Sequence, residues 1–308
     1  MKWRTAATTI LFSKSTRTVL MMKRGETAKF MPNIYVFPGG LLELEADSSF
    51  PKEKTNFSRV TSQPIKMEGF DSDFIFRVGA ARELFEETGI LLVEDRVNRE
   101  KRLLSTLADK SLREWREKVQ EDPSKFQDLF QDFNLDVQRM LPWSNWLTPV
   151  TYEQRFDTLF FVVPFEEEVQ IDMCNKEMSD FKWVSPSQVI QENASHIDEA
   201  VIAPPQFYEL SRLHVTPNER LGNMANPRRM CPQFIRSEED GNQLYGVFPG
   251  DHLYVTEDAE NVQPKELSEE ELKEDPTKPM HRMGYKKKPH FANSQLYINN
   301  VDVLKPKL

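Results

Sequence analysis

The chain has 308 residues, enough to bury the core of one large domain or of two smaller ones. Its 49 acidic side chains outnumber the 40 lysines and arginines and give a formal net charge of −9, which disfavours nonspecific binding to nucleic acids or anionic membranes. Two cysteines, Cys174 and Cys231, are too few for a disulfide scaffold and lack metal-site spacing, and no apolar run approaches the length of a membrane span.

The N-terminal segment contains two β-rich runs, ATTILF and TVLMMKR, which we expect to form two strands separated by a polar turn. The same segment is basic and has no acidic residue before Glu26, so a mitochondrial presequence is the alternative. A further strand is predicted at 33–40, where Pro38-Gly39-Gly40 is expected to form a turn or loop. Residues 46–75 are polar with little periodicity, which predicts an inserted surface segment.

The next stretch, RVGAARELFEETGILL at 77–92, predicts a helix that ends at Gly89 and continues into a short strand. Glu83, Glu86 and Glu87 share one face of this helix, and the opposite face carries side chains for a core. Three like charges repel one another unless a positive group lies among them. A bound divalent cation would meet this requirement, and the alternative is a solvated acidic face with an ordinary ion pair.

The remainder of the chain mixes both kinds of secondary structure. Apolar residues at helical spacing predict a helical segment at 98–141, with a second helix starting at Asp122-Pro123. WLTPV, DTLFFVVPF and FKWV predict strands, and helices follow from Pro186 and in PPQFYELSRL. Beyond residue 220, LYGVFPGDHLYVT and SQLYINNV predict strands that flank an acidic, exposed segment at 257–279. The fold class is therefore expected to be α/β or α+β.

Residues 82–90, RELFEETGI, match REUxEExGU, the centre of the Nudix box, where U is aliphatic. The chain thus resembles the Nudix superfamily, and the resemblance implies an α/β/α sandwich with a mixed sheet that hydrolyses nucleoside diphosphates linked to another group. It also implies a cofactor, Mg²⁺ or Mn²⁺, held by this helix. Glu86 and Glu87 are then the expected ligands, and Glu83 is either a third ligand or the group that orients the attacking water. Arg82, one turn before Glu86, is expected to hold that carboxylate in place.

The box is split in an unusual way. Gly40 of FPGG and Arg82 are 42 positions apart, far more than in the usual box, so Glu43, Glu45 and Asp47 all compete for the place of the intermediate acid. A box divided after FMPNIYVFPGG resembles the RP2-type, mammalian Nudix-19-like subgroup, whose members are implicated as peroxisomal coenzyme A diphosphatases. The segments WSNWLTPVTYEQRFDTLFFV and IAPPQFYELSRL extend this resemblance over about two thirds of the chain.

A coenzyme A signature upstream of the box is partly present as LMMKRGETAKFMPNIYVFPGG. Arg24 and the glycines Gly39 and Gly40 are kept, whereas Lys29 replaces a second arginine and Asn33 replaces a glycine. The resemblance implies that these glycines belong to the substrate site and that Arg24 and Lys29 bind the extra phosphate of coenzyme A. The alternative for Arg24 and Lys29 is a surface pair at the end of a strand.

Other candidates follow from position alone. Arg155 and Asp157 precede an apolar strand, where Nudix proteins often line the substrate groove, although a plain ion pair is an equal alternative. Glu177 could assist the attacking water, but a solvated role is favoured. Phe207 and Tyr208 could stack on an adenine, but their helical spacing favours a core role. Neither cysteine has a base near it in the sequence, so a thiol nucleophile is not expected.

These features predict a Nudix domain at 1–220, with insertions at 46–75 and 98–141, and a C-terminal extension at 221–308. The expected reaction is hydrolysis of coenzyme A or acyl-coenzyme A to 3′,5′-ADP and a phosphopantetheine. ADP-ribose, NADH or an NDP-sugar is the alternative substrate, and a non-catalytic nucleotide-binding module is the alternative class. Residues 98–141 and the extension are expected to wall the acyl end of the substrate.

The expected partner is a small nucleotide, with no nucleic acid and no membrane, and the oligomeric state stays open. The C-terminal Pro306-Lys307-Leu308 resembles a peroxisomal address, with the cytoplasm or the mitochondrion as alternatives.

Overall fold

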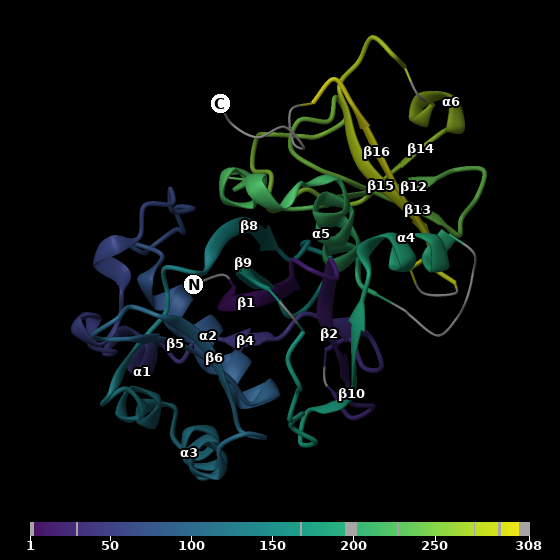
Figure 1. Cartoon of the computed structure of the whole chain (residues 1–308). Coiled ribbons are helices and arrows are strands. Elements are labelled where there is room, and N and C mark those ends of the chain that lie inside the picture. The colour runs from purple at the N-terminus through teal and green to yellow at the C-terminus, as the bar shows by residue number, and fades with distance from the viewer. Residues whose placement is uncertain are drawn as a thin grey trace.

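A mixed eight-stranded sheet organises the computed structural model, which describes residues 3–28, 30–166, 168–194, 202–226, 228–273, 275–288 and 291–301 (Figure 1). Its main path runs in the order β10 (Met178–Val184), β2 (Thr18–Arg24), β1 (Arg4–Ser13), β9 (Phe156–Phe165), β8 (Leu141–Leu147) and β11 (Arg229–Met230). Strand β1 is parallel to β9 and antiparallel to β2. The two predicted N-terminal strands therefore lie inside the sheet, as expected for a folded segment. In the described ranges, no helix has the length and apolar character needed to cross a membrane.

Side chains alternate along β1 and build a core on each face of this sheet. Ala7 and Leu11 pack in one core with α2 (Phe74–Thr88), whereas Ile10 and Phe12 pack in the other with α4 (Pro186–Ala194) and α5 (Pro204–Val215). Helices thus cover both faces, and the α/β/α sandwich with a mixed sheet is confirmed.

Two short strands carry the FPGG segment. β3 (Tyr35–Val36) pairs with β2, and β4 (Gly39–Leu41) pairs with β1. The expected turn at Pro38-Gly39-Gly40 is therefore wrong for the two glycines, which lie in a strand. A Cβ on Gly39 would lie 2.5 Å from the carbonyl oxygen of Ala7, so glycine is required by the close approach of the two backbones.

The helix α2 ends as the sequence predicts but begins three residues before the predicted stretch. Gly89 has a left-handed backbone with φ +71°, and its N–H donates to the carbonyl oxygen of Phe85. Leu84 and Phe85 are fully buried, as expected for the core face. Arg77 is also fully buried, where it pairs with Asp73 at 2.7 Å.

The insertion at 46–75 is a surface segment only in part, because it mixes exposed residues with buried ones. It overlaps α1 (Leu44–Ser48) and contains the 3₁₀ helices η1 (Lys52–Lys54) and η2 (Phe57–Arg59). Phe50, Ile65 and Met67 are buried in the same core as α2. Because these apolar residues are spaced irregularly, they show no periodicity, yet they cover the outer side of α2.

The segment at 98–141 is helical only in part. Helices α3 (Lys110–Glu121) and η3 (Pro123–Leu129) match the prediction, including a start at Asp122-Pro123. Residues 101–105 instead form β6 (Lys101–Ser105), which pairs with β5 (Ile90–Asp95), while β7 (Phe133–Leu135) pairs with the other edge of β5. The helical expectation is wrong for 101–105, because Leu103 and Leu104 meet strand partners that local spacing does not reveal.

The C-terminal extension forms a second sheet next to α5 (Figure 1). Its order is β14 (Lys265–Leu267), β12 (Gln233–Ser237), β13 (Gln243–Val247), β15 (Met280–Lys286) and β16 (Ala292–Asn299), with η4 (Asn218–Asn223) before it and α6 (Glu269–Leu272) within it. β13 and β16 overlap the predicted strands, but the prediction is wrong for residues 248–256, which follow β13 as loop and turns. Met283 and Tyr285 share a core with Phe207 and Tyr208, which are buried as the sequence favoured.

Candidate active site

Helix α2 presents its acidic face to a cavity of about 720 Å³. Glu83, Glu86 and Glu87 line this cavity together with Gly39 and Gly40 of β4. The helix and β4 are held side by side because β4 pairs with β1, against which α2 packs. The two halves of the split motif therefore meet in space, although they are 42 positions apart in the sequence.

Arg82 ties the acidic side chains into one network. Its Nη1 donates to Oε1 of Glu83 and to Oε1 of Glu86, each at 2.8 Å. Its Nε and Nη2 donate to the two carboxylate oxygens of Asp47 at 2.9 and 3.0 Å, and Nη2 also donates to the carbonyl oxygen of Leu41. Arg82 and Asp47 are 2% and 1% exposed, so this pair lies out of water. Such fixed geometry holds a functional carboxylate in one orientation.

Asp47 is thus the acid that the structure brings to the arginine. Of the three upstream candidates, Glu43 and Glu45 are exposed, and Glu43 also lines the cavity. Asp47 additionally accepts the backbone N–H of Glu43 at 2.9 Å, which closes the short turn of α1. The direction in which the short helix α1 turns each side chain decides which acid faces Arg82, and the spacing of the motif does not reveal it.

The two glycines shape the cavity around the glutamates. The backbone N–H of Gly39 donates to Oε2 of Glu87 at 2.9 Å. A Cβ on Gly40 would lie 2.5 Å from Oε2 of Glu83, so this glycine leaves the room that the glutamate occupies. Gly39 and Gly40 therefore position the carboxylates as well as lining the site.

Burial raises the pKa of each glutamate on this face. For Glu83 the pKa is raised to about 7, against the lowering effect of Arg82. Burial likewise raises the pKa of Glu86, and it raises the pKa of Glu87 well above its usual range, with Glu83 adding to the effect. Burial alone would lower the pKa of Arg82, but the hydrogen bond to Asp47 and the charges of its acidic partners raise it. Burial thus penalises the charged form of these carboxylates by more than Arg82 and the N–H of Gly39 favour it.

These donors fit a divalent cation, although the described residues contain no ready-made group of three histidine, cysteine, aspartate or glutamate side chains around a metal position. The hydrogen bonds use one oxygen each of Glu83, Glu86 and Glu87. The second oxygen of each carboxylate has no protein partner in the described ranges. Oxygen donors of this kind suit Mg²⁺ or Mn²⁺, which complete their shell with water and substrate phosphate.

The predicted phosphate-binding residues have different fates. Arg24 lines the cavity, and its Nε is buried without a hydrogen-bond partner. Lys29 lies outside the described residues. Arg155 does not line the cavity: its guanidinium donates to the carbonyl oxygens of Thr148 and Glu260, each at 2.8 Å. The structure therefore gives Arg155 a role in joining the β8–β9 loop to the C-terminal extension, and it does not place this arginine with the substrate.

The remaining candidates are also placed. Asp157 forms an ion pair with Arg229 at 2.9 Å, the plainer of its two interpretations. Glu177 is exposed as favoured, yet it lines the cavity. Cys174 reaches the cavity and accepts a hydrogen bond from Gln120, while burial raises the pKa of Cys231 to about 11.

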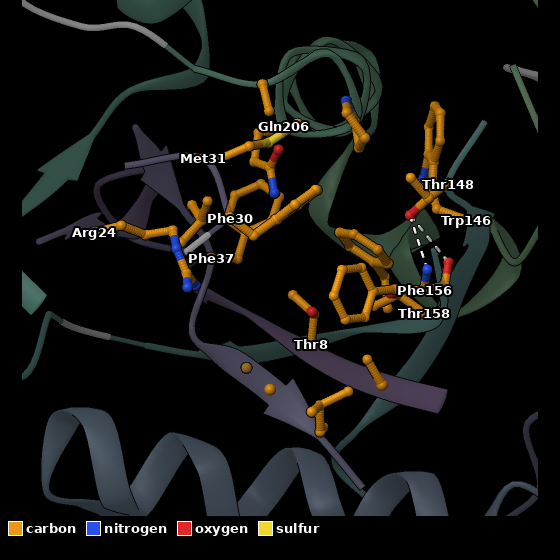
Figure 2. A pocket seen from close by; sticks show the side chains of 18 of the residues that line it. Thr8, Arg24, Phe30, Met31, Phe37, Trp146, Thr148, Phe156, Thr158 and Gln206 are labelled. Atoms are coloured by element: carbon orange, nitrogen blue, oxygen red, sulfur yellow. Dashed lines mark hydrogen bonds between the residues drawn. The ribbon is translucent and has the colours of Figure 1, made fainter. Parts of the chain in front are cut away.

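The sequence does not predict several residues that form part of the cavity wall. Thr8, Phe30, Met31, Trp146 and Gln206 line the cavity and come from four separate segments (Figure 2). The C-terminal extension adds Pro232, Phe234, Gly246, Phe248, Met283 and Tyr285. Apolar and aromatic residues in these places look like ordinary core positions, so no local signal marks them as a site.

Comparisons with known proteins agree with this geometry. Residues 48–213, more than half of the chain, match a family model described as the NUDT19 Nudix domain. A putative nudix hydrolase 7 from Caenorhabditis elegans is 33% identical over 99% of this chain and 91% of its own length. An acyl-coenzyme A diphosphatase NUDT19 from Xenopus laevis is 34% identical over 77% of this chain and 71% of its own. The crystal structure of a NUDIX hydrolase from Alicyclobacillus acidocaldarius, 21% identical, covers 72% of this chain and 97% of its own with a TM-score of 0.60, a likeness in fold.

Proposed function

The chain belongs to the Nudix hydrolases, in their NUDT19-like subgroup, and we propose that it is a metal-dependent diphosphatase of coenzyme A or acyl-coenzyme A. The products would be 3′,5′-ADP and a free or acylated phosphopantetheine. The acyl-coenzyme A diphosphatases among its relatives support this substrate class.

One observation carries the proposal: a single cavity joins a charged half to an uncharged half. The charged lining residues all come from the first 177 residues of the chain: the glutamates and Arg82 of α2, together with Arg4, Arg24, Glu43, Lys176 and Glu177. The other half is walled by α5 and the C-terminal sheet, which contribute no lysine, arginine, aspartate or glutamate to the lining in the described ranges. Coenzyme A has the same division, since a charged nucleotide and diphosphate are joined to a long uncharged arm.

The roles of the side chains follow from their contacts. Glu86 and Glu87 would hold the metal ion, which when bound neutralises diphosphate charge and acidifies a water molecule. Arg82 fixes Glu83 and Glu86, and the N–H of Gly39 fixes Glu87. Glu83 either completes the ligand set or accepts a proton from the attacking water at Oε2. Hydrolysis of a diphosphate needs mainly such positioning and charge neutralisation.

Product analysis tests the proposal. The purified protein is incubated with Mg²⁺ and, separately, with coenzyme A, ADP-ribose or NADH. The same assay is run on Glu87→Gln and on a control, Glu114→Gln, which alters an exposed glutamate of α3. We expect 3′,5′-ADP from coenzyme A in the wild type and the control, and at least about a hundredfold less in Glu87→Gln, since a ligand to the metal is lost.

The other outcomes are informative as well. Cleavage of ADP-ribose or NADH alone would keep the metal helix and overturn the coenzyme A assignment. No product from any substrate would favour a non-catalytic nucleotide-binding module. Equal activity of Glu87→Gln and the wild type would show that the acidic face of α2 has no role in the reaction.

A further inference from the structure

The uncharged half of the cavity contains a polar group that the reaction itself does not use. Gln206, in the first turn of α5, is 8% exposed and lines the cavity. Its Oε1 is buried without a hydrogen-bond partner in the described part of the chain. Figure 2 shows the amide nitrogen pointing away from the helix toward Phe30.

An unpaired buried amide is unfavourable for folding. Leaving a buried donor or acceptor unsatisfied costs about 1–3 kcal/mol, and natural proteins contain few such groups. An apolar side chain of the same length would avoid this cost. The position is therefore better suited to binding than to stability, because a ligand with an amide or a carbonyl group would satisfy Gln206.

The surroundings of Gln206 indicate the kind of ligand. The helix α5 starts at Pro204 and Pro205, which have no N–H to donate, so its N-terminus is a poor site for a phosphate. The C-terminal sheet contributes Phe234, Met283 and Tyr285 to the lining, and these residues share an apolar core with Phe207, which follows Gln206 in the chain. No charged side chain from residue 203 onward lines the cavity in the described ranges. An uncharged chain with amide groups fits this wall, whereas a nucleotide does not.

We propose that Gln206 and the apolar wall of the C-terminal sheet form the subsite for the acylated pantetheine arm of the substrate. This inference rests on the proposed function. A half-turn of the amide group presents the unpaired Oε1 of Gln206 to an amide N–H of the arm, and in the orientation of Figure 2 the amide nitrogen donates to a carbonyl oxygen of the arm. The acyl chain beyond the thioester then lies against Met283 and Tyr285. The extension thus sets the preference for acylated substrates, while α2 supplies the chemistry.

Binding of the arm alone tests the subsite without relying on catalysis. The probe is S-octanoylpantetheine, which has the arm and an acyl chain but no nucleotide or diphosphate. Its affinity is measured by titration calorimetry on the full chain, for the wild type, Gln206→Met and the control Gln188→Met. Gln188 is exposed on α4 and is not part of the cavity lining.

We expect the wild type and Gln188→Met to bind the probe equally and Gln206→Met to bind it about tenfold more weakly, the loss of one buried hydrogen bond. The melting temperature of Gln206→Met should equal or exceed that of the wild type, because the unpaired amide is gone. A purely structural glutamine would give the opposite shift. Gln206→Glu, which keeps the shape but adds a charge, should also weaken binding and provides the test if the first variant does not fold.

Kinetics separate the inference from the proposed function. In Gln206→Met, we expect KM for octanoyl-coenzyme A to rise about tenfold with kcat nearly unchanged, as for a group that binds the ground state and transition state alike. Cleavage of coenzyme A without binding of the probe, or equal binding by Gln206→Met, would overturn the subsite and leave the proposed function intact. Binding of the probe without cleavage of coenzyme A would support the subsite and overturn the proposed function.

Discussion

Replacing Asp47 with asparagine should damage both the stability and the activity of the protein. Asp47 and Arg82 are paired through two hydrogen bonds of 2.9 and 3.0 Å and are almost completely buried. Removing one partner of a buried pair typically costs about 3–5 kcal/mol, because the other charge stays buried. Glu83 and Glu86 still compensate Arg82, so we expect the low end, about 3 kcal/mol. For a chain of 308 residues this corresponds to a fall in Tm of roughly 5 °C.

The activity should fall as well, because a freed Arg82 no longer holds Glu86 in one place. Loss of such an orienting contact usually lowers activity about 10–100-fold. Scanning calorimetry and the rate of 3′,5′-ADP release measure the two effects. The matched control is Glu45→Gln, an exposed acid on the same short helix, which should change neither. If Asp47→Asn is as stable and as active as Glu45→Gln, the assignment of Asp47 to the arginine network is refuted.

Three further predictions concern space, charge and protonation. Gly40→Ala should lower kcat at least about tenfold, because its Cβ would lie 2.5 Å from a carboxylate oxygen of Glu83. Arg24→Gln should raise KM for coenzyme A about tenfold through loss of a phosphate contact, whereas Arg155→Gln should leave KM unchanged. Burial lowers the pKa of His281 from 6.5 to about 4. Between these two pH values the histidine is protonated in the unfolded chain and neutral in the folded chain. The free energy of unfolding is therefore retained above about pH 6.5, and this histidine lowers it by about 2 kcal/mol between pH 7.5 and 5.

Each of these predictions has a simple control. Gly222→Ala, where an added Cβ meets no atom within 4 Å, should keep full activity, and equal losses in both glycine variants would contradict the steric argument. If KM rises as much in Arg155→Gln as in Arg24→Gln, Arg155 contributes to substrate binding and the prediction is wrong. Urea unfolding at the two pH values measures the histidine effect, and His281→Gln should lose about 2 kcal/mol less stability than the wild type on acidification. The same loss in both proteins would mean that other groups cause it.

The sequence alone determined the parts of this protein that depend on local order. Helix α2, its end at Gly89 and its row of glutamates follow from helical spacing and from the left-handed preference of glycine, which involve neighbours within a few residues. Strands β1 and β2 are equally local, since both are β-rich runs. The proposed chemistry depends on this same short stretch, so the sequence alone is enough to indicate the family.

The tertiary structure decided which distant residues meet. Residues 101–105 became a strand because β5 offers a partner, and Asp47 reached Arg82 because the insertion folds back over α2. In the sequence Gln206 is one polar residue of a helix, and only the fold buries it beside the cavity. Burial and pairing depend on contacts between segments far apart in the chain, and such contacts leave no periodic trace in the sequence. The acidic face of α2 can therefore be predicted from the sequence, whereas the wall proposed to bind the acyl arm forms only when distant segments come together in the folded protein.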